Sequence, residues 1–113
     1  MSLPRLNRRL TLETPQKGPD GAGGYTTTWM PLGQLWASCQ SRGGGSERGE
    51  GGSPIAAVSY TIVVRGAPQG SPARPRPEQR FRDGGRIFNI RAVTERDESG
   101  MYLTCFAEEE LVA

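Results

Sequence analysis

RFRDGGRIFNIRAVTERDESGMYLTCFAEE, the stretch Arg80–Glu109, decides the fold. Its apolar, aromatic and β-branched residues gather in short segments at 86–93 and 101–107, the composition of β-strands. Asp83-Gly84-Gly85 precedes the first of them, and its glycines supply the positive φ of a tight hairpin turn. ERDESG, at 95–100, marks the next turn. The stretch therefore predicts successive antiparallel strands that are joined by short turns.

The same pattern continues through the rest of the chain. Further strand-like segments lie at 8–13, 25–30, 35–40, 59–64 and 79–82. Pro31 and Gly33 predict a bulge or a corner between two of these segments. A short helix at 54–58 is a weaker alternative for that part of the chain. About seven short strands bounded by turns predict an all-β fold, a small antiparallel β-barrel or sandwich.

Length and composition limit the size of this fold. The 113 residues predict a single domain over 1–113, with one modest core and long flexible loops at 14–24, 42–53 and 66–78. No apolar run is long enough to span a membrane, and the N-terminal residues lack the apolar centre of a secretory signal. We therefore expect a cytoplasmic protein without membrane contact. The expected core residues are Leu10, Leu12, Trp36, Tyr60, Ile62, Val64, Phe88, Ile90, Leu103 and Cys105.

Residue types that usually carry catalysis or bind metals are scarce. The chain has no histidine, which removes the commonest general base. Cys39 and Cys105 cannot build an ordinary structural zinc site by themselves, and we expect both to be buried free thiols. No glycine motif of the Walker or dinucleotide-binding type occurs. We therefore expect no catalytic residue, no metal and no cofactor.

One segment cannot contribute to a core. Arg42–Ser53 is rich in glycine and has no apolar side chain, although strand-like sequence flanks it on both sides. Such a segment cannot offset its own ordering entropy within a monomer. It is either a functional loop that neighbouring molecules order or a tolerated surface insertion.

Charge is unevenly distributed along the chain. Residues 65–91 carry seven arginines against two acidic residues, whereas residues 92–113 carry six acidic residues against one arginine. Opposite flanks suit head-to-tail contacts between copies, which close into rings when the rotation allows it. The simpler interpretation is that both flanks are solvated and that their ion pairs contribute little.

The order of several motifs resembles the head-tail joining proteins of long-tailed phages, the head-closure or stopper family. The most similar pieces are LWAS at 35–38, YTIVVR at 60–65 and GRIFNI at 85–90, and the similarity extends over nearly the whole chain. The loop at 66–77 departs from the family pattern because it is longer and richer in proline. The resemblance implies a small structural β-barrel without cofactor or catalytic activity, which forms a homo-oligomeric ring in the virion neck of a phage or a gene transfer agent.

This resemblance favours assembly as the purpose of both the charged flanks and the glycine-rich segment. It implies a ring between portal or adaptor proteins and a tail terminator or other tail proteins, assembled in the bacterial cytoplasm, through which DNA passes without sequence-specific binding. We expect the three arginines of the interface to point outward, so that reversing their charge leaves the monomer folded. The candidate subunit or neck interface is Arg80, Arg82, Arg86, Glu108, Glu109 and Glu110. The candidate channel or docking loop is Arg42, Gly43, Gly44, Gly45, Ser46, Glu47 and Arg48.

Two other function classes remain open at this point. Arginines surround Phe81, and Trp29, Tyr25 and Tyr60 could stack on bases, as in small barrels that bind single-stranded nucleic acid. The net charge of +2 is low for such a module. The stretch 72–75, Pro-Ala-Arg-Pro, could instead dock on a peptide-binding partner as a polyproline helix.

Overall fold

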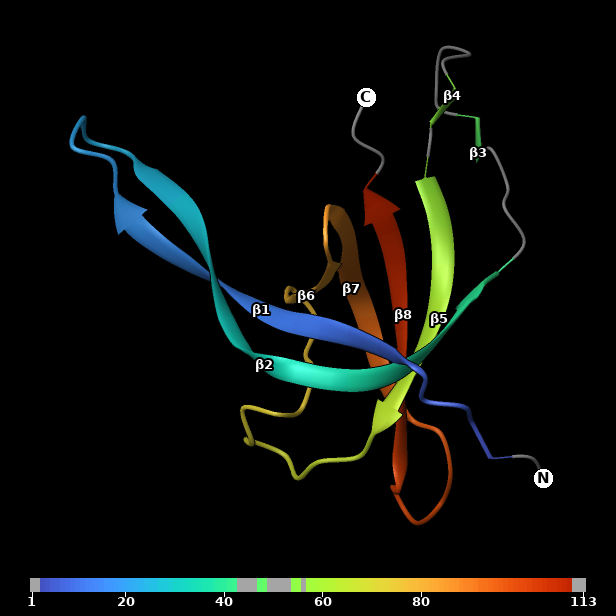
Figure 1. Cartoon of the computed structure of the whole chain (residues 1–113). Coiled ribbons are helices and arrows are strands. Elements are labelled where there is room, and N and C mark those ends of the chain that lie inside the picture. The colour runs from blue at the N-terminus through green and yellow to red at the C-terminus, as the bar shows by residue number, and fades with distance from the viewer. Residues whose placement is uncertain (1–2, 43–46, 49–53, 56, 111–113) are drawn as a thin grey trace.

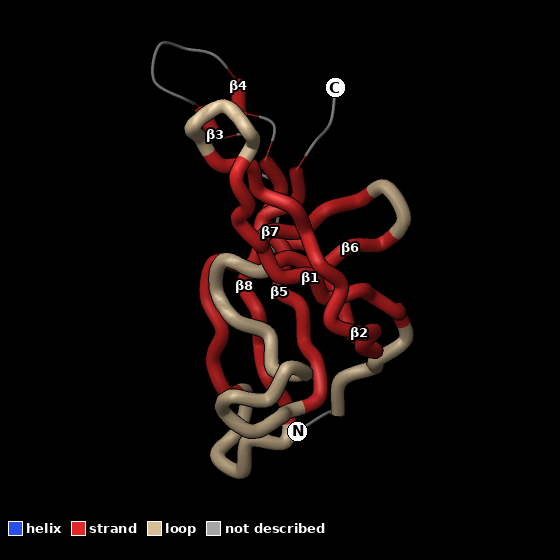
Figure 2. Tube along the Cα trace, turned by 90° about the vertical axis from the view of Figure 1, so that its left-hand side faces the viewer, coloured by secondary structure: helices blue, strands red, loops and turns tan. Residues whose placement is uncertain are grey.

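The computed structural model describes residues 3–42, 47–48, 54–55 and 57–110. Within these ranges all regular structure is β-strand, so no helix there could span a membrane (Figures 1 and 2). The stretch 54–58, the alternative place for a short helix, contributes strand residues instead. The strands are β1 (Arg8–Pro19), β2 (Tyr25–Ser41), β3 (Glu47–Arg48), β4 (Pro54–Ile55), β5 (Ala57–Arg65), β6 (Arg80–Asp83), β7 (Arg86–Glu95) and β8 (Tyr102–Glu110).

Six strands form one ring-like antiparallel sheet in the order β1-β2-β5-β8-β7-β6. The sheet closes because β6 pairs back onto β1, with Leu12 opposite Phe81 and Glu13 opposite Arg80. The strands β3 and β4 pair only with each other. The prediction of an all-β antiparallel fold is confirmed, and closure leaves few open edges in the body of the sheet.

The first two strands are longer than the sequence suggested. β1 continues to Pro19, so the prediction of a loop over 14–24 is wrong, and the turn is confined to the residues between β1 and β2. The predicted strands at 25–30 and 35–40 are parts of one continuous β2. The bulge between them is confirmed, since the register shifts where Leu12 faces Gly33 and Glu13 faces Pro31, which leaves Leu32 as the extra residue.

The far half of this hairpin is an arm that leaves the closed sheet (Figure 1). β1 pairs with β6 only up to Glu13, and β2 pairs with β5 only from Ala37 onward. Residues 14–30 therefore pair only with each other, as a two-stranded ribbon about 20 Å long. Two-stranded ribbons are marginally stable alone, so the arm depends on the body at its root.

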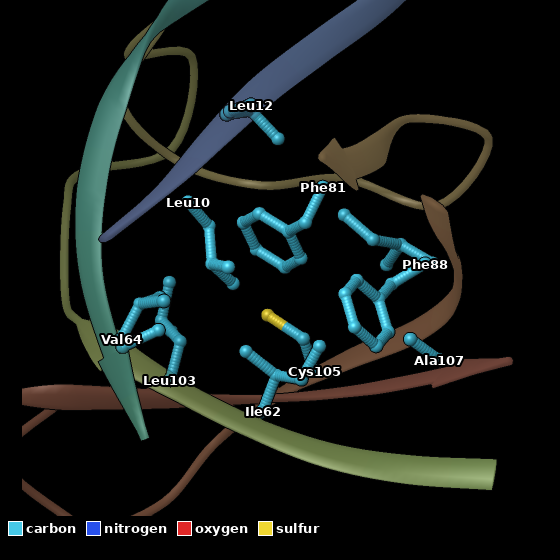
Figure 3. Close-up of a cluster of buried hydrophobic side chains, with 11 residues drawn as sticks. Leu10, Leu12, Ile62, Val64, Phe81, Phe88, Leu103, Cys105 and Ala107 are labelled. Carbon is cyan, nitrogen blue, oxygen red and sulfur yellow. The ribbon is translucent and has the colours of Figure 1, made fainter. Parts of the chain in front are cut away.

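Apolar side chains fill the interior of the closed sheet (Figure 3). Phe81 and Phe88 are the largest of them, and loop 66–78 adds the buried Pro75. Trp36 was expected in this core and the expectation is wrong, because 53% of it is exposed. Its neighbours Leu35 and Ala37 face the core instead. Tyr60 is partly buried against the core. The remaining expected core residues are all buried: Leu10, Leu12, Ile62, Val64, Phe88, Ile90, Leu103 and Cys105.

Both cysteines are free thiols, and only Cys105 is fully buried. Cys39 and Cys105 lie on either side of Ile62, on strands that do not pair with each other. That arrangement separates them by about two strand spacings, roughly 10 Å, which is too far for a disulfide. Burial raises the pKa of the Cys105 thiol to about 12, so this thiol stays protonated and behaves as a small apolar side chain.

Candidate functional site

Arg86 of the basic flank and Glu109 of the acidic flank form an ion pair within one chain. Arg86 begins β7 on the face that Phe88 also occupies, and Glu109 lies opposite Phe88 on β8. The guanidinium places Nε 2.7 Å from Oε2 and Nη2 3.0 Å from Oε1 of Glu109, and Nη2 also donates to the Tyr60 hydroxyl at 2.9 Å. The Glu109 side chain is only 10% exposed. The hydrogen bonds from Arg86 therefore lower the pKa of this carboxyl.

The other two acidic residues of this set lie on the outer face of the same strand pair. Arg91 donates Nε to Glu108 at 2.8 Å, and Asn89 donates Nδ2 to Glu110 at 2.9 Å. The side chains of Arg91 and Glu108 are 62% and 44% exposed. Solvent screens such pairs, so they contribute little to stability but remain accessible to another molecule.

A buried carboxylate, Glu13, holds the remaining two arginines. Its side chain is 3% exposed, and the Nε atoms of Arg80 and Arg82 lie 2.7 Å and 3.2 Å from its two oxygens. The Arg80 guanidinium also stacks on Trp29, 4.0 Å from the ring centroid. Sequence reasoning missed Glu13, because no local pattern distinguishes it. The one available signal is its position opposite Pro31, beside the bulge at Leu32.

The three arginines therefore differ in their accessibility. Arg80 lies on the outer face of β6 with Arg82, as expected, but its side chain is only 13% exposed because it packs against Glu13 and Trp29. Arg86 is 41% exposed but shares the face of the buried Phe88. Only Arg82, at 50%, lies largely open on the outer surface. Reversing all three charges would thus place two new carboxylates beside the buried Glu13 and one beside Glu109, so the structure argues against an intact monomer in the triple variant.

An exposed tryptophan, Trp36 of β2, lies on the same outer face as Arg82 of β6, with β1 between the two strands. Trp36 pairs with Arg9 across strands, and the Arg9 guanidinium lies 5.2 Å from the centroid of its ring. Arg9 also donates Nη1 to Gln34 at 3.1 Å. In the next row, Thr11 lies between Gln34 and Arg82. We call these five residues the tryptophan patch: Arg9, Thr11, Gln34, Trp36 and Arg82.

At the end of the opposite β7–β8 pair, residues 95–101 form an acidic turn that begins at the last residue of β7 and leads into β8. Asp97 organises it, because its carboxylate accepts hydrogen bonds from the Ser99 hydroxyl and, at 3.3 Å, from the Tyr102 N–H. These hydrogen bonds lower the pKa of the Asp97 carboxyl, and the bond from Ser99 has the largest effect. Glu95 and Glu98 are exposed, and Met101 is 56% exposed at the end of the turn.

Most of the predicted channel loop lies outside the described residues. Gly43, Gly44, Gly45 and Ser46 belong to that part, while Glu47 and Arg48 form β3, which pairs with β4. Arg42 is described at the root of the segment. Its N–H donates to the Ser59 carbonyl at 2.8 Å, and its guanidinium lies 5.1 Å from the centroid of Phe106.

The described residues contain no cluster of three or more side chains that could hold a metal ion. A groove of about 250 Å³ lies between loop 66–78 and β2. Within the described part of the chain, no titratable side chain lines this groove. The polyproline interpretation of 72–75 loses support, since Pro75 is buried and Arg74 donates Nη1 to the Ala67 carbonyl at 2.9 Å. Two of the proposed base-stacking residues are also engaged: Tyr60 packs edge-on against Phe88, and Arg80 covers Trp29.

Comparisons with known proteins identify a family, a similar virion chain and a further chain with the same fold. Residues 1–110 match the family model described as phage head completion protein. A chain of the virion of a native gene transfer agent particle is 53% identical, with a TM-score of 0.85 over 98% of this chain and 100% of that one. Protein SF1141 from Shigella flexneri 2a shares the fold, with 22% identity and a TM-score of 0.62 over 96% of both chains. No curated protein matches the chain.

Proposed function

Because the chain belongs to the phage head completion protein family, we propose that it is a structural component of the neck of a phage-like particle, where it joins head to tail. Head completion proteins are structural rather than catalytic. The observation that carries the proposal is the similarity to a chain of the gene transfer agent virion, at 53% identity over essentially the full length of both chains. Identity at this level over a full domain supports a shared place in the particle as well as a shared fold.

Copies of the chain form a ring in this proposal, between portal or adaptor proteins and the tail. Head-to-tail contacts between copies need two different surfaces on each copy. The described surface offers them: Arg82 remains accessible on the β6–β1–β2 face, and Glu108 and Glu110 remain accessible on the β7–β8 face. The other members of the set stabilise these two faces by internal contacts. Arg80 pairs with Glu13, and Arg86 pairs with Glu109 and donates to Tyr60.

Segment 42–53 borders the DNA channel of the ring in this proposal and helps retain packaged DNA. The support is chemical. The segment has no apolar side chain with which to pack on its own subunit, and its charged and glycine residues suit a wet surface beside DNA. No sequence-specific readout is proposed, because a channel must pass every sequence.

The decisive experiment removes the chain from cells that produce the particles. We expect DNA-filled heads that lack tails, or heads that have lost their DNA, counted by electron microscopy and by nuclease-protected DNA. Full-length chain supplied in trans is the control and should restore tailed, filled particles. Purified particles should contain the chain at the neck, visible by antibody labelling. Normal numbers of filled, tailed particles without the chain would refute the proposal.

A further inference from the structure

We propose that the tryptophan patch of one copy receives the acidic turn of the next copy. This inference rests on the proposed function and places the acidic side of the ring contact at the turn that joins β7 to β8, at the opposite end of these strands from Glu108 and Glu110. The main support for this contact is Trp36, a large aromatic side chain that is 53% exposed on a paired strand. Tryptophan and arginine are the residue types that most often dominate binding energy at protein interfaces.

The chemistry of the two surfaces is complementary. Arg9 and Arg82 give the patch positive charge, and only Arg82 is offset, by Glu13. The acidic turn presents Glu95 and Glu98 against a single arginine, and within the described residues neither glutamate has an ion-pair partner. Opposite potentials guide such surfaces into register more than they add affinity.

Met101 supplies the apolar half of the contact. It is 56% exposed at the end of the acidic turn. A methionine thioether makes favourable contacts with an aromatic ring, and its flexible side chain adapts to the surface it meets. Placing Met101 on Trp36 would bury the two exposed apolar groups together and would bring Glu95 or Glu98 close to Arg9.

Both surfaces are held in shape before they meet. Arg9 is fixed over the Trp36 ring by its hydrogen bond to Gln34. The acidic turn is braced through Asp97, and the Gly100 N–H donates to the Asp97 carbonyl at 3.1 Å. Preorganised surfaces lose less conformational entropy on association.

The positions of the surfaces fit a ring. In the closed sheet, β1 and β2, which carry Arg9 and Trp36, are separated from β7 and β8 by β6 on one side and β5 on the other. The acidic turn projects from the end of the opposite β7–β8 pair, whereas Arg82 lies on the intervening β6 (Figure 1). A contact between these two different surfaces of successive copies is heterologous, and it propagates until the rotation closes it. A two-fold dimer would instead need one surface that is complementary to itself.

The first test is photo-crosslinking in assembled particles. Trp36 is replaced with benzoylphenylalanine in the full-length chain, and particles are irradiated and analysed by mass spectrometry. We expect crosslinks to residues 95–101 of a second copy. Crosslinks to DNA, to another protein or to a different segment of the chain would overturn the inference. Absence of the chain from particles would count against the proposed function instead.

The second test is a charge exchange. One variant carries Arg9→Glu and the other carries Glu95→Arg with Glu98→Arg; all three positions are exposed, and urea melts verify folding. Each variant alone brings like charges together at every contact, so we expect tailed particles to fall about tenfold or more. Co-expression restores opposite charges at every contact between alternating variants, so the count should recover. Lys17→Glu, on the arm, is the matched control and should have no effect. Failure of co-expression to restore particles would overturn the inference, as would normal assembly by either variant alone.

Discussion

Replacing Arg80 with methionine removes the nearest partner of a buried carboxylate. The Glu13 side chain is 3% exposed, and Arg80 approaches it at 2.7 Å. Methionine retains much of the apolar length of arginine beside the Trp29 ring, so the substitution changes charge more than packing. Arg82 remains 3.2 Å from the other carboxylate oxygen.

The cost follows from these distances. At 2.7 Å, two unit charges attract by about 6 kcal/mol at an effective dielectric constant of about 20, and desolvation offsets part of that. Removing one partner of a buried pair costs about 3–5 kcal/mol, since the other charge stays buried. The Arg82 side chain, 50% exposed, compensates for about 1 kcal/mol of this loss. We therefore expect Arg80→Met to lower the free energy of unfolding by about 2–4 kcal/mol.

Urea unfolding followed by tryptophan fluorescence measures this loss. For a chain of this size the midpoint should fall by about 1–3 M. Arg82→Met is the matched control and should cost about 1 kcal/mol or less. The double variant Glu13→Leu/Arg80→Met removes both buried charges and should recover more than half of the loss. A stability of Arg80→Met within about 0.5 kcal/mol of wild type would refute the reasoning, as would a double variant less stable than Arg80→Met alone.

Three further outcomes follow from the structure. Ile62→Ala should lower the unfolding free energy by about 2–5 kcal/mol, because Ile62 is completely buried; a loss below about 1 kcal/mol in a urea melt would contradict its place in the core. Bonds from Arg86 hold the pKa of Glu109 below its ordinary 4.5, so ionised Glu109 stabilises the fold above that pH and the contribution is lost as pH falls through the folded-state pKa. Arg86→Met should therefore lose less stability than wild type on acidification, and parallel curves of unfolding free energy against pH would exclude this role. Deleting Gly44–Gly51 should change stability by well under 1 kcal/mol, because closure entropy varies slowly with loop length, yet it should yield particles that lose DNA or fail to accept tails; wild-type particle counts would identify the segment as a passive insertion.

Local sequence patterns determined the all-β class, most strand positions and most of the core. SYTIVV at 59–64 lies within β5, and its Ile62 and Val64 are buried as expected. The Asp83-Gly84-Gly85 turn joins β6 to β7, and Gly84 has the positive φ of +62° that such turns require. These features depend on residues that are neighbours in the chain, so composition and spacing are enough to predict them. The motif order was likewise enough to predict the family, which the match over residues 1–110 confirms.

Which face each side chain occupies was decided by the tertiary structure. Strand side chains alternate, so a choice that is wrong by one residue exchanges inside and outside. Leu35 and Ala37 face the core and Trp36 faces solvent, because β2 pairs with β1 in the register that places Leu35 opposite the buried Leu10. The bulge at Leu32 then changes which alternate residues of β2 face each side of the sheet in the arm. No pattern within β2 alone reveals this change.

The charge pairs could not be predicted from the sequence either. Arg80 and Glu13 are 67 residues apart, and they meet only because β6 closes the sheet against β1. Arg86 and Glu109 meet because β7 and β8 pair with Phe88 opposite Glu109. Counting charges along the chain separates a basic flank from an acidic one, whereas strand pairing brings the two together. The free charge on the surface is what remains after those internal pairs have formed, and only the folded sheet determines which pairs those are.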